Sequence, residues 1–199
     1  EEIAAGKFTP EVMWKMGRVG SQKLSPDGTL ALFTITYYNM ATNKGTTGLY
    51  VMPAEGGEVV RLVKNASSPQ WVGGRIYYMA GDGQVWGILP DGSDKVQVTD
   101  VKGIECFGIA PTESALFYTK KVHVVNIKGS DVYTDADKSK ARIYDDLMVR
   151  HWDYWDQGDY SHIFVTELKG NTIAAGKDIM AGEAWDAPMA PYFDNAESS

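Results

Sequence analysis

The feature that most constrains this sequence of 199 residues is a turn-and-strand module that recurs along it. Residues 24–34 (LSPDGTLALFT) place a tight turn before an alternating apolar strand, and residues 109–119 (IAPTESALFYT) align with them without a gap. Residues 71–79 (WVGGRIYYM) follow the same pattern with a turn about two residues shorter. Copies that recur about every 40 to 47 residues predict a fold built by repetition of one supersecondary unit.

A second module, a β-hairpin, lies inside each of the first two units. Residues 49–57 (LYVMPAEGG) give a strand and a turn, and residues 59–63 return as the next strand. Residues 85–93 (VWGILPDGS) and 96–99 repeat this hairpin. The Glu-Gly and Asp-Gly pairs put glycine where such a hairpin requires a positive φ. Each unit therefore contains about four short strands, which is typical of one blade of a β-propeller.

We therefore expect an all-β fold, a partial and open β-propeller of about three and a half four-stranded blades after a short N-terminal helix. The expected divisions are 1–22 for the helix and lead-in and 23–199 for the propeller, with blades at 23–64, 65–100 and 101–182 and the start of another at 183–199. The polar residues 131–146 of the third unit are expected to form an exposed insertion. The alternative is a β-sandwich whose hairpins resemble one another by chance.

The expected number of blades has a consequence for closure of the ring. Propellers close with about four to eight blades, and an open one leaves a bare sheet edge. Further residues of the same polypeptide, a separate chain or a partner molecule would have to complete the ring. Ahead of the first blade, Thr9 is the expected N-cap of the helix and Pro10 suits its first position, while Gly17 and Gly20 are expected to end it.

The composition excludes several classes of function. The formal net charge is −7 and no basic stripe is present, so tight nucleic-acid binding is not expected. The longest apolar stretches are only a few residues, far short of the roughly 20 that cross a bilayer. Cys106 is the single cysteine, which leaves no internal disulfide, and a small buried side chain is expected there. The abrupt start at Glu1 suits an exported protein that has lost its signal peptide, or a chain trimmed for expression.

Several short motifs together resemble one known family. They are residues 8–11 (FTPE), 16–20 (MGRVG), 24–28 (LSPDG), 49–52 (LYVM), 149–155 (VRHWDYW) and 161–165 (SHIFV). This set resembles the N-terminal part of the β-propeller domain of bacterial prolyl-oligopeptidase-family serine peptidases, in the dipeptidyl-peptidase and acylaminoacyl-peptidase branches. The likeness covers most of the chain. The SPDG turn alone is common to many propellers, whereas the RHWD segment is more specific.

The resemblance implies an α/β-hydrolase domain that carries a Ser-Asp-His triad and needs no cofactor. No Gly-x-Ser-x-Gly elbow occurs in these residues, so the chain alone is not expected to perform the chemistry. Its implied role is to shape the entrance that admits peptides and excludes folded proteins. The implied partners are the remaining blades, the hydrolase domain and a peptide substrate, with a homo-oligomer also open. The implied location is periplasmic or secreted.

The densest group of candidate binding residues is Arg150, His151, Trp152, Asp153 and Trp155. A guanidinium can hold a peptide carboxylate or carbonyl through charge-assisted hydrogen bonds, and tryptophans can wall an apolar pocket. The structural alternative is an Arg150–Asp153 ion pair with both tryptophans in the core between blades. No metal site is expected, because the three histidines lack the close spacing of zinc motifs.

A function of a different class stays open from the sequence. A stand-alone TolB-like propeller, which serves as a protein- or ligand-binding scaffold, carries similar SPDG turns. A nucleophile elbow some hundreds of residues further along the gene favours the peptidase. A gene that ends after a few more blades favours the scaffold.

Overall fold

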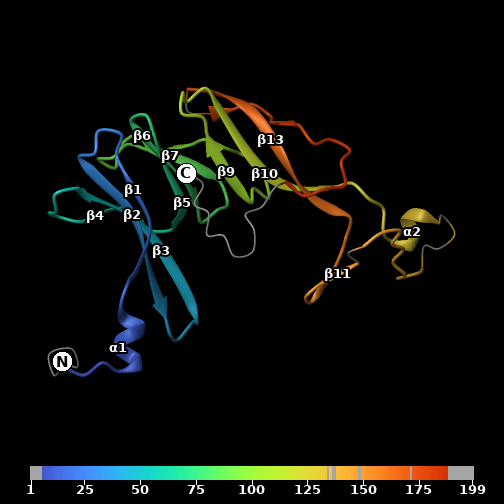
Figure 1. Cartoon of the computed structure of the whole chain (residues 1–199), viewed down its shortest axis with the longest axis horizontal. Coiled ribbons are helices and arrows are strands. Elements are labelled where there is room, and N and C mark those ends of the chain that lie inside the picture. The colour runs from blue at the N-terminus through green and yellow to red at the C-terminus, as the bar shows by residue number, and fades with distance from the viewer. Residues whose placement is uncertain (1–5, 134, 136–137, 148, 171, 188–199) are drawn as a thin grey trace.

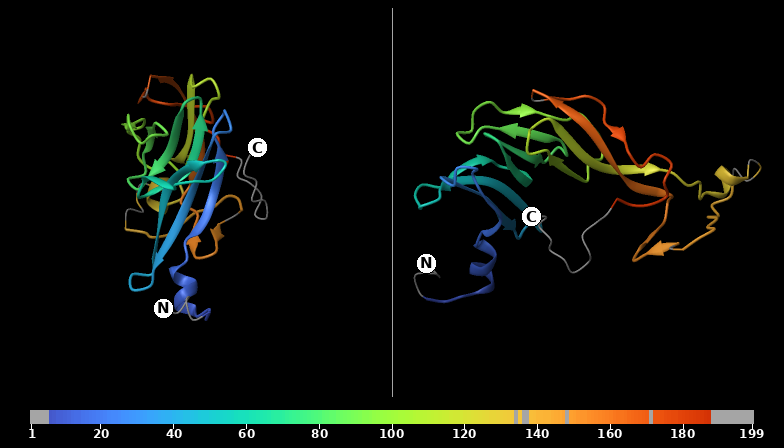
Figure 2. Two further views of the ribbon diagram at one scale, coloured as in Figure 1. Left: turned by 90° about the vertical axis from the view of Figure 1, so that its left-hand side faces the viewer. Right: turned by 45° about the horizontal axis from the view of Figure 1, so that its top comes forward.

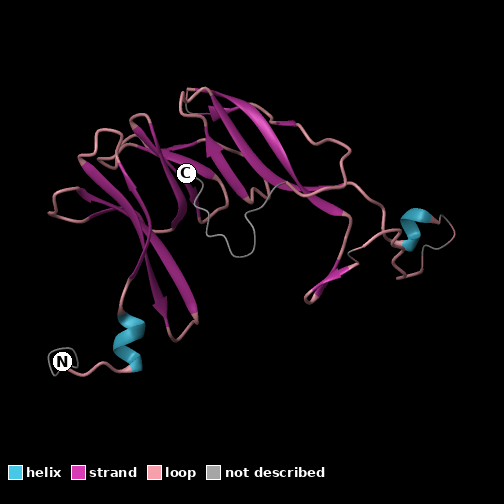
Figure 3. Cartoon of the chain, viewed as in Figure 1, coloured by secondary structure: helices cyan, strands magenta, loops and turns pink. Residues whose placement is uncertain are grey.

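Three antiparallel sheets follow one another along the chain in the computed structural model, which describes residues 6–133, 135, 138–147, 149–170 and 172–187 (Figures 1 and 3). The first sheet joins β1 (Arg18–Leu24), β2 (Leu30–Asn39), β3 (Lys44–Pro53) and β4 (Val60–Val63) in that order. The second joins β5 (Ala66–Val72), β6 (Arg75–Ala80), β7 (Val85–Ile88) and β8 (Val96–Gln97). The third joins β9 (Cys106–Ile109), β10 (Ala115–His123), β13 (Asp159–Lys169) and β14 (Thr172–Ile173), and β15 (Lys177–Asp178) also pairs with β13. Simple meander order in each sheet is that of a propeller blade.

The middle sheet has no solvent face, and strand β6 shows why. Ile76 and Tyr78 belong to the core shared with the first sheet, whereas Tyr77, between them, belongs to the core shared with the third. Side chains of a strand alternate between its two faces, so an almost continuous apolar run serves both interfaces. The run at residues 75–80 therefore reflects burial on both sides.

The two hydrophobic cores each draw on neighbouring sheets. Leu32 and Leu49 of the first sheet pack with Ile88 of the second, and Val85 of the second packs with Leu116 of the third. Figure 2 shows the sheets fanned out in sequence. A β-sandwich has a single core between two sheets, so this arrangement excludes it. The expected all-β partial propeller with a short N-terminal helix is confirmed.

The tight turns are built by short polar side chains. In the first blade the Asp27 carboxylate accepts hydrogen bonds from the Ser25 hydroxyl (2.6 Å) and from the Thr29 backbone N–H (3.0 Å). Gly28 follows at φ 72°, a conformation that glycine adopts without steric cost. The aligned turn of the third blade places Glu113 at this position with φ 53°, a conformation that strains a residue other than glycine.

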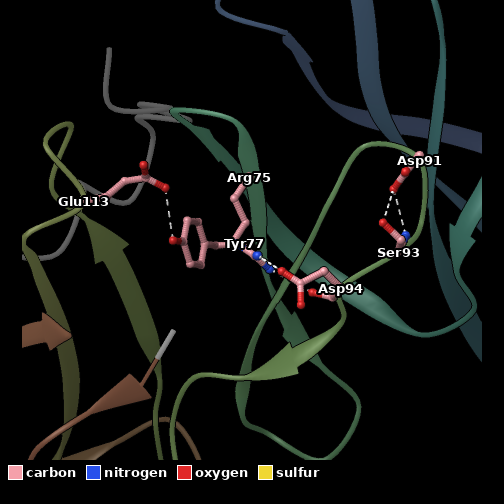
Figure 4. A network of polar contacts seen from close by, with 6 residues as sticks. All are labelled: Arg75, Tyr77, Asp91, Ser93, Asp94 and Glu113. Carbon is pink, nitrogen blue, oxygen red and sulfur yellow. Dashed lines mark hydrogen bonds and ion pairs between the residues drawn. The ribbon is translucent and has the colours of Figure 1, made fainter. Parts of the chain in front are cut away.

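The Glu113 side chain makes a contact between the second and third blades (Figure 4). The Tyr77 hydroxyl donates a hydrogen bond to Oε1 of Glu113 at 3.2 Å. On the second blade itself, Arg75 forms an ion pair with Asp94. Nearby, the side-chain amide of Gln70 donates to the Phe107 carbonyl (2.8 Å) and accepts from the Ile109 N–H (3.1 Å). Polar side chains therefore align neighbouring blades that share no strand pairing.

Helix α1 (Pro10–Lys15) precedes the first blade and follows the expected capping chemistry. The Thr9 hydroxyl accepts a hydrogen bond from the Val12 N–H at 3.3 Å. The helix ends at Lys15, before Gly17. Gly20 does not end it, because that residue already lies in β1 (Arg18–Leu24). The expected division between residues 22 and 23 falls inside this strand, next to an irregularity in its pairing with β2 between Gly20 and Lys23.

A long insertion, residues 124–158, separates β10 from β13 and is called the arm below. It contains α2 (Gly129–Val132), β11 (Arg150–His151) and β12 (Tyr154–Trp155), and it reaches out beyond the third sheet (Figure 1). The polar stretch expected as an insertion is only its middle. Cys106, expected to be buried, is exposed because it opens β9 at the edge strand of the sheet. Of the residues expected to begin another blade, 188–199 lie outside the described residues, and 183–187 lie beside β13.

Candidate functional site

The candidate residues predicted from the sequence meet in one small hairpin of the arm. Arg150 pairs with Trp155 across strands β11 and β12, and His151 pairs with Tyr154. Trp152 and Asp153 form the turn, where Trp152 has φ 49° and leaves 75% of its surface exposed. The structure thus brings the predicted residues together at the tip of an exposed element.

The Trp155 ring is the centre of this hairpin. The guanidinium of Arg150 lies 5.5 Å from its centroid and that of Arg142 lies 5.9 Å away. Tyr144 stacks on the same ring with centroids 6.4 Å apart and an interplanar angle of 21°, and its hydroxyl donates to the Asp156 carbonyl at 3.0 Å. Such cation–π contacts and stacking hold a partly exposed aromatic ring in place.

These contacts differ from the structural alternative derived from the sequence. The ion pairs found among the described residues do not include Arg150 with Asp153, and Arg150 instead lies against an aromatic face. Trp152 and Trp155 are exposed and do not belong to the cores between blades. The hairpin therefore presents one cation and two indole rings to its surroundings, a set that can contact a peptide through charge and apolar area.

The base of the arm is fixed by backbone and histidine contacts. The Gly158 carbonyl accepts hydrogen bonds from the N–H groups of Val124 (2.9 Å) and Val125 (3.2 Å). Nδ1 of His123 lies 2.9 Å from Oδ1 of Asp159, and the hydrogen bond to this carboxylate raises the pKa of His123 above its usual range. The arm therefore leaves and rejoins the third blade at one point.

Two of the histidines lie at different places on the third blade. His162 is buried in β13, while His123 lies at the base of the arm. Over the described part of the chain, no group of three or more His, Cys, Asp or Glu residues lies close enough to hold a metal ion. No helix in that part has the length and apolar character needed to cross a membrane.

A second concave feature, which the sequence did not indicate, opens on the third blade. It is a cleft of about 460 Å³ with Tyr118 and Phe164 on its wall and two lysines, Lys102 and Lys120, at its border. The two aromatic rings stack at 5.1 Å, and Nζ of Lys120 lies 4.7 Å from the centroid of Phe164. The only signal in the sequence is the alternation along β10, which places Tyr118 and Lys120 on one face.

Comparison with solved structures identifies the fold. The fold matches an acylaminoacyl peptidase from Pyrococcus horikoshii with a TM-score of 0.62 and 15% identity, over 83% of this chain and 25% of that one. It also matches the β-propeller domain of the Trilobed protease from Pyrococcus furiosus with a TM-score of 0.52 and 10% identity, over 82% of this chain and 43% of that one. The chain is thus a partial β-propeller of the kind found in these peptidases.

Comparison with curated sequences is more specific. No family model matches the chain. Dipeptidyl-peptidase 5 of Porphyromonas endodontalis is 34% identical over 96% of this chain, and that of Porphyromonas gingivalis is 34% identical over 93%. The chain spans only 28% of the length of either relative. The resemblance expected from the sequence is confirmed: over most of its length the chain is similar to part of dipeptidyl-peptidase 5, and its fold is that of the propeller regions of acylaminoacyl peptidases.

Proposed function

We propose that this chain is the non-catalytic propeller segment of a serine peptidase that cleaves short peptides, and that it shapes access to an α/β-hydrolase active site outside these residues. The observation that carries the proposal is 34% identity to dipeptidyl-peptidase 5 across 96% of the chain, within a match that covers 28% of that peptidase. Hydrolysis would proceed by transfer of the peptide acyl group to a serine oxygen with release of the amine, followed by transfer of the acyl group to water, and would need no cofactor. A periplasmic or secreted location belongs to the same proposal.

The outer faces of the first and third sheets support completion of the ring by further blades. On the third sheet Phe117 and Val165 are directly opposite each other on β10 and β13, with 46% and 39% of their surfaces exposed. On the first sheet Phe33 and Tyr50 stack on the face turned away from the second sheet. Propeller blades bury such apolar faces against their neighbours.

The arm gives this segment a direct contact with the substrate in our proposal. Arg150 would donate charge-assisted hydrogen bonds to a peptide carbonyl or carboxylate. Trp152 and Trp155 would contact the apolar side chains of the peptide. His151 and Asp153 belong to the same hairpin and are part of the proposed binding site. The exposure of both indoles and the absence of an Arg150–Asp153 pair among the described ion pairs support this role.

The test compares the complete gene product with residues 1–199 alone. We expect the complete product to react with a serine-directed fluorophosphonate probe and to release dipeptides from short peptides. Residues 1–199 alone should show neither property, because they lack a nucleophile elbow. A complete product that binds proteins or ligands but is neither labelled nor active would overturn the proposal in favour of the TolB-like scaffold.

A further inference from the structure

His162 is a completely buried histidine whose two ring nitrogens both face acceptors. Nδ1 lies 2.9 Å from Oδ2 of Asp178, and Nε2 lies 2.9 Å from the backbone carbonyl oxygen of Glu183. The side chain has no exposed surface. A carboxylate and a carbonyl accept hydrogen bonds and do not donate them, so both contacts form only when both ring nitrogens carry hydrogen. This geometry is that of a protonated imidazolium.

Both acceptors belong to one segment, residues 177–187, which we call the strap. The strap follows the edge of β13: Asp178 pairs with Phe164 in the β13–β15 register, and the Ile179 N–H donates to the Ile163 carbonyl at 3.1 Å. Further on, Asp186 accepts a hydrogen bond from the Ser161 N–H at 2.8 Å. His162 therefore lies in the middle of the surface that the strap covers.

The charged and titratable groups around His162 come from three elements. The strap contributes the carboxylates of Asp178 and Asp186, strand β10 contributes Lys120 as the direct cross-strand partner of His162, and β13 itself contributes Tyr160 on the same face. Acidic groups outnumber the one ammonium group. The hydrogen bond to Asp178 is the main cause that raises the pKa of His162, and it outweighs the burial that acts in the opposite direction.

We propose that His162 is a pH-sensitive clasp, which fastens the strap to β13 when the ring is protonated and lets it detach when the ring loses a proton. A neutral imidazole keeps one N–H, so the other nitrogen turns a lone pair toward an oxygen in a site without water access. That contact changes from an attractive hydrogen bond to a repulsion between two acceptors.

The direction of the pH effect follows from the raised pKa. The stabilisation is fully present below the pKa of about 6.5 that a histidine has in an open strap. It is lost as the pH rises from that value through the higher pKa of the folded state, and it does not change further above it. Over this whole pH range, the equilibrium constant for strap opening increases tenfold for each pH unit between the pKa of His162 in the open strap and its pKa in the folded state.

The experiment uses the complete gene product and two mass-spectrometric readouts between pH 5 and pH 9. Exchange of the imidazole C2 hydrogen gives the titration midpoint of His162. Amide exchange, corrected for its intrinsic pH dependence, gives the opening of the strap at Ile179 and Ala187. We expect strap opening to rise tenfold for each pH unit by which the measured midpoint of His162 exceeds about 6.5. The corrected amide exchange of β6 should not change over the same pH range.

Variants separate the clasp from general loss of stability. Asp178→Asn keeps an oxygen acceptor but removes the charge, so it should lower the midpoint of His162 and shrink the pH-dependent rise in strap opening. His162→Gln should abolish that rise, and His123→Gln, at the base of the arm, should leave it unchanged. A His162 that is neutral throughout this range, or strap opening that stays independent of pH in the parent protein, overturns the proposal. If His162→Gln does not fold, the Asp178→Asn comparison still decides.

Discussion

The guanidinium of Arg150 lies 5.5 Å from the centre of the Trp155 ring, and the two residues are direct cross-strand partners in the hairpin of the arm. Arg142 approaches the same ring at 5.9 Å from outside the hairpin. The two arginines thus share one aromatic contact but differ in position, because only Arg150 belongs to the hairpin with Trp152. This difference allows contact with substrate to be separated from support of the indole.

Replacing Arg150 should impair peptide turnover. We expect Arg150→Ala in the complete gene product to raise KM about tenfold, which is the effect of losing one charge-assisted hydrogen bond. The melting temperature should change little, since an exposed cation–π contact is worth about 0.5–1 kcal/mol. Steady-state hydrolysis of short peptides, with thermal unfolding in parallel, measures both effects.

Arg142→Ala is the matched control for this prediction. It removes the second cation from the Trp155 ring and should leave KM within about twofold of the parent value, because one cation–π contact remains. Peptide turnover that is unchanged in Arg150→Ala would argue against contact between the hairpin and the substrate.

Tyr77 and Tyr78 are adjacent in β6 and should respond in opposite ways to loss of the hydroxyl. The Tyr78 hydroxyl is buried with no hydrogen-bond partner in the described structure, and burial raises its pKa to about 12. Tyr78→Phe should therefore leave the free energy of unfolding unchanged or raise it by about 1 kcal/mol. Chemical denaturation measures the difference.

The neighbouring substitution is the control. Tyr77→Phe removes a hydrogen bond to Glu113 and should lower the free energy of unfolding by about 1 kcal/mol. A loss of stability in Tyr78→Phe equal to that in Tyr77→Phe would show that the Tyr78 hydroxyl has a partner after all.

Gly158 and Gly103 share a φ of 76° but differ in the space around them. A Cβ at Gly158 would overlap the Val125 carbonyl at the base of the arm, whereas no atom lies within 4 Å of one at Gly103. Gly103→Ala should cost only the left-handed backbone strain of about 1–2 kcal/mol. Gly158→Ala should cost more and should speed amide exchange and proteolysis in residues 124–158. Equal protection of the arm in the two variants would contradict this account.

Acid should loosen the first turn at a defined pH. Hydrogen bonds from the Ser25 hydroxyl and from Thr29 lower the pKa of Asp27 to about 2. Because the pKa is lower in the folded state, the carboxylate stabilises the turn above its ordinary pKa of about 3.9 and loses this effect as the pH falls through about 2. An NMR titration of the Asp27 carboxyl carbon measures the midpoint. In the Asp27→Asn variant, the amide exchange of Thr29 should be faster and insensitive to this transition.

The repeats made the blades predictable, while long-range contacts did not follow from the sequence. The turn at Asp27 and the apolar run in residues 75–80 are local signals, and each marks a strand that the structure contains. The full extent of the arm was missed because only its middle is polar, while the aromatic residues of β11 and β12 that follow are typical of strands in a blade. The sequence could not decide whether Trp155 lies in the core between blades or at the surface, because an aromatic residue type does not by itself indicate how exposed the side chain is. The clasp at His162 depends on residues 16 and 21 positions away, beyond any local pattern.

Strand β6 also bears on how the propeller avoids misfolding. In a sheet with one solvent-exposed face, a shift of the strand register by one residue moves apolar side chains into the solvent and is strongly disfavoured. In the middle sheet the same shift would merely exchange Ile76 and Tyr78 with Tyr77 between two dry interfaces. Hydrophobicity therefore cannot select the correct alignment here, and the task falls to directional bonds such as those of Gln70 with the backbone of β9.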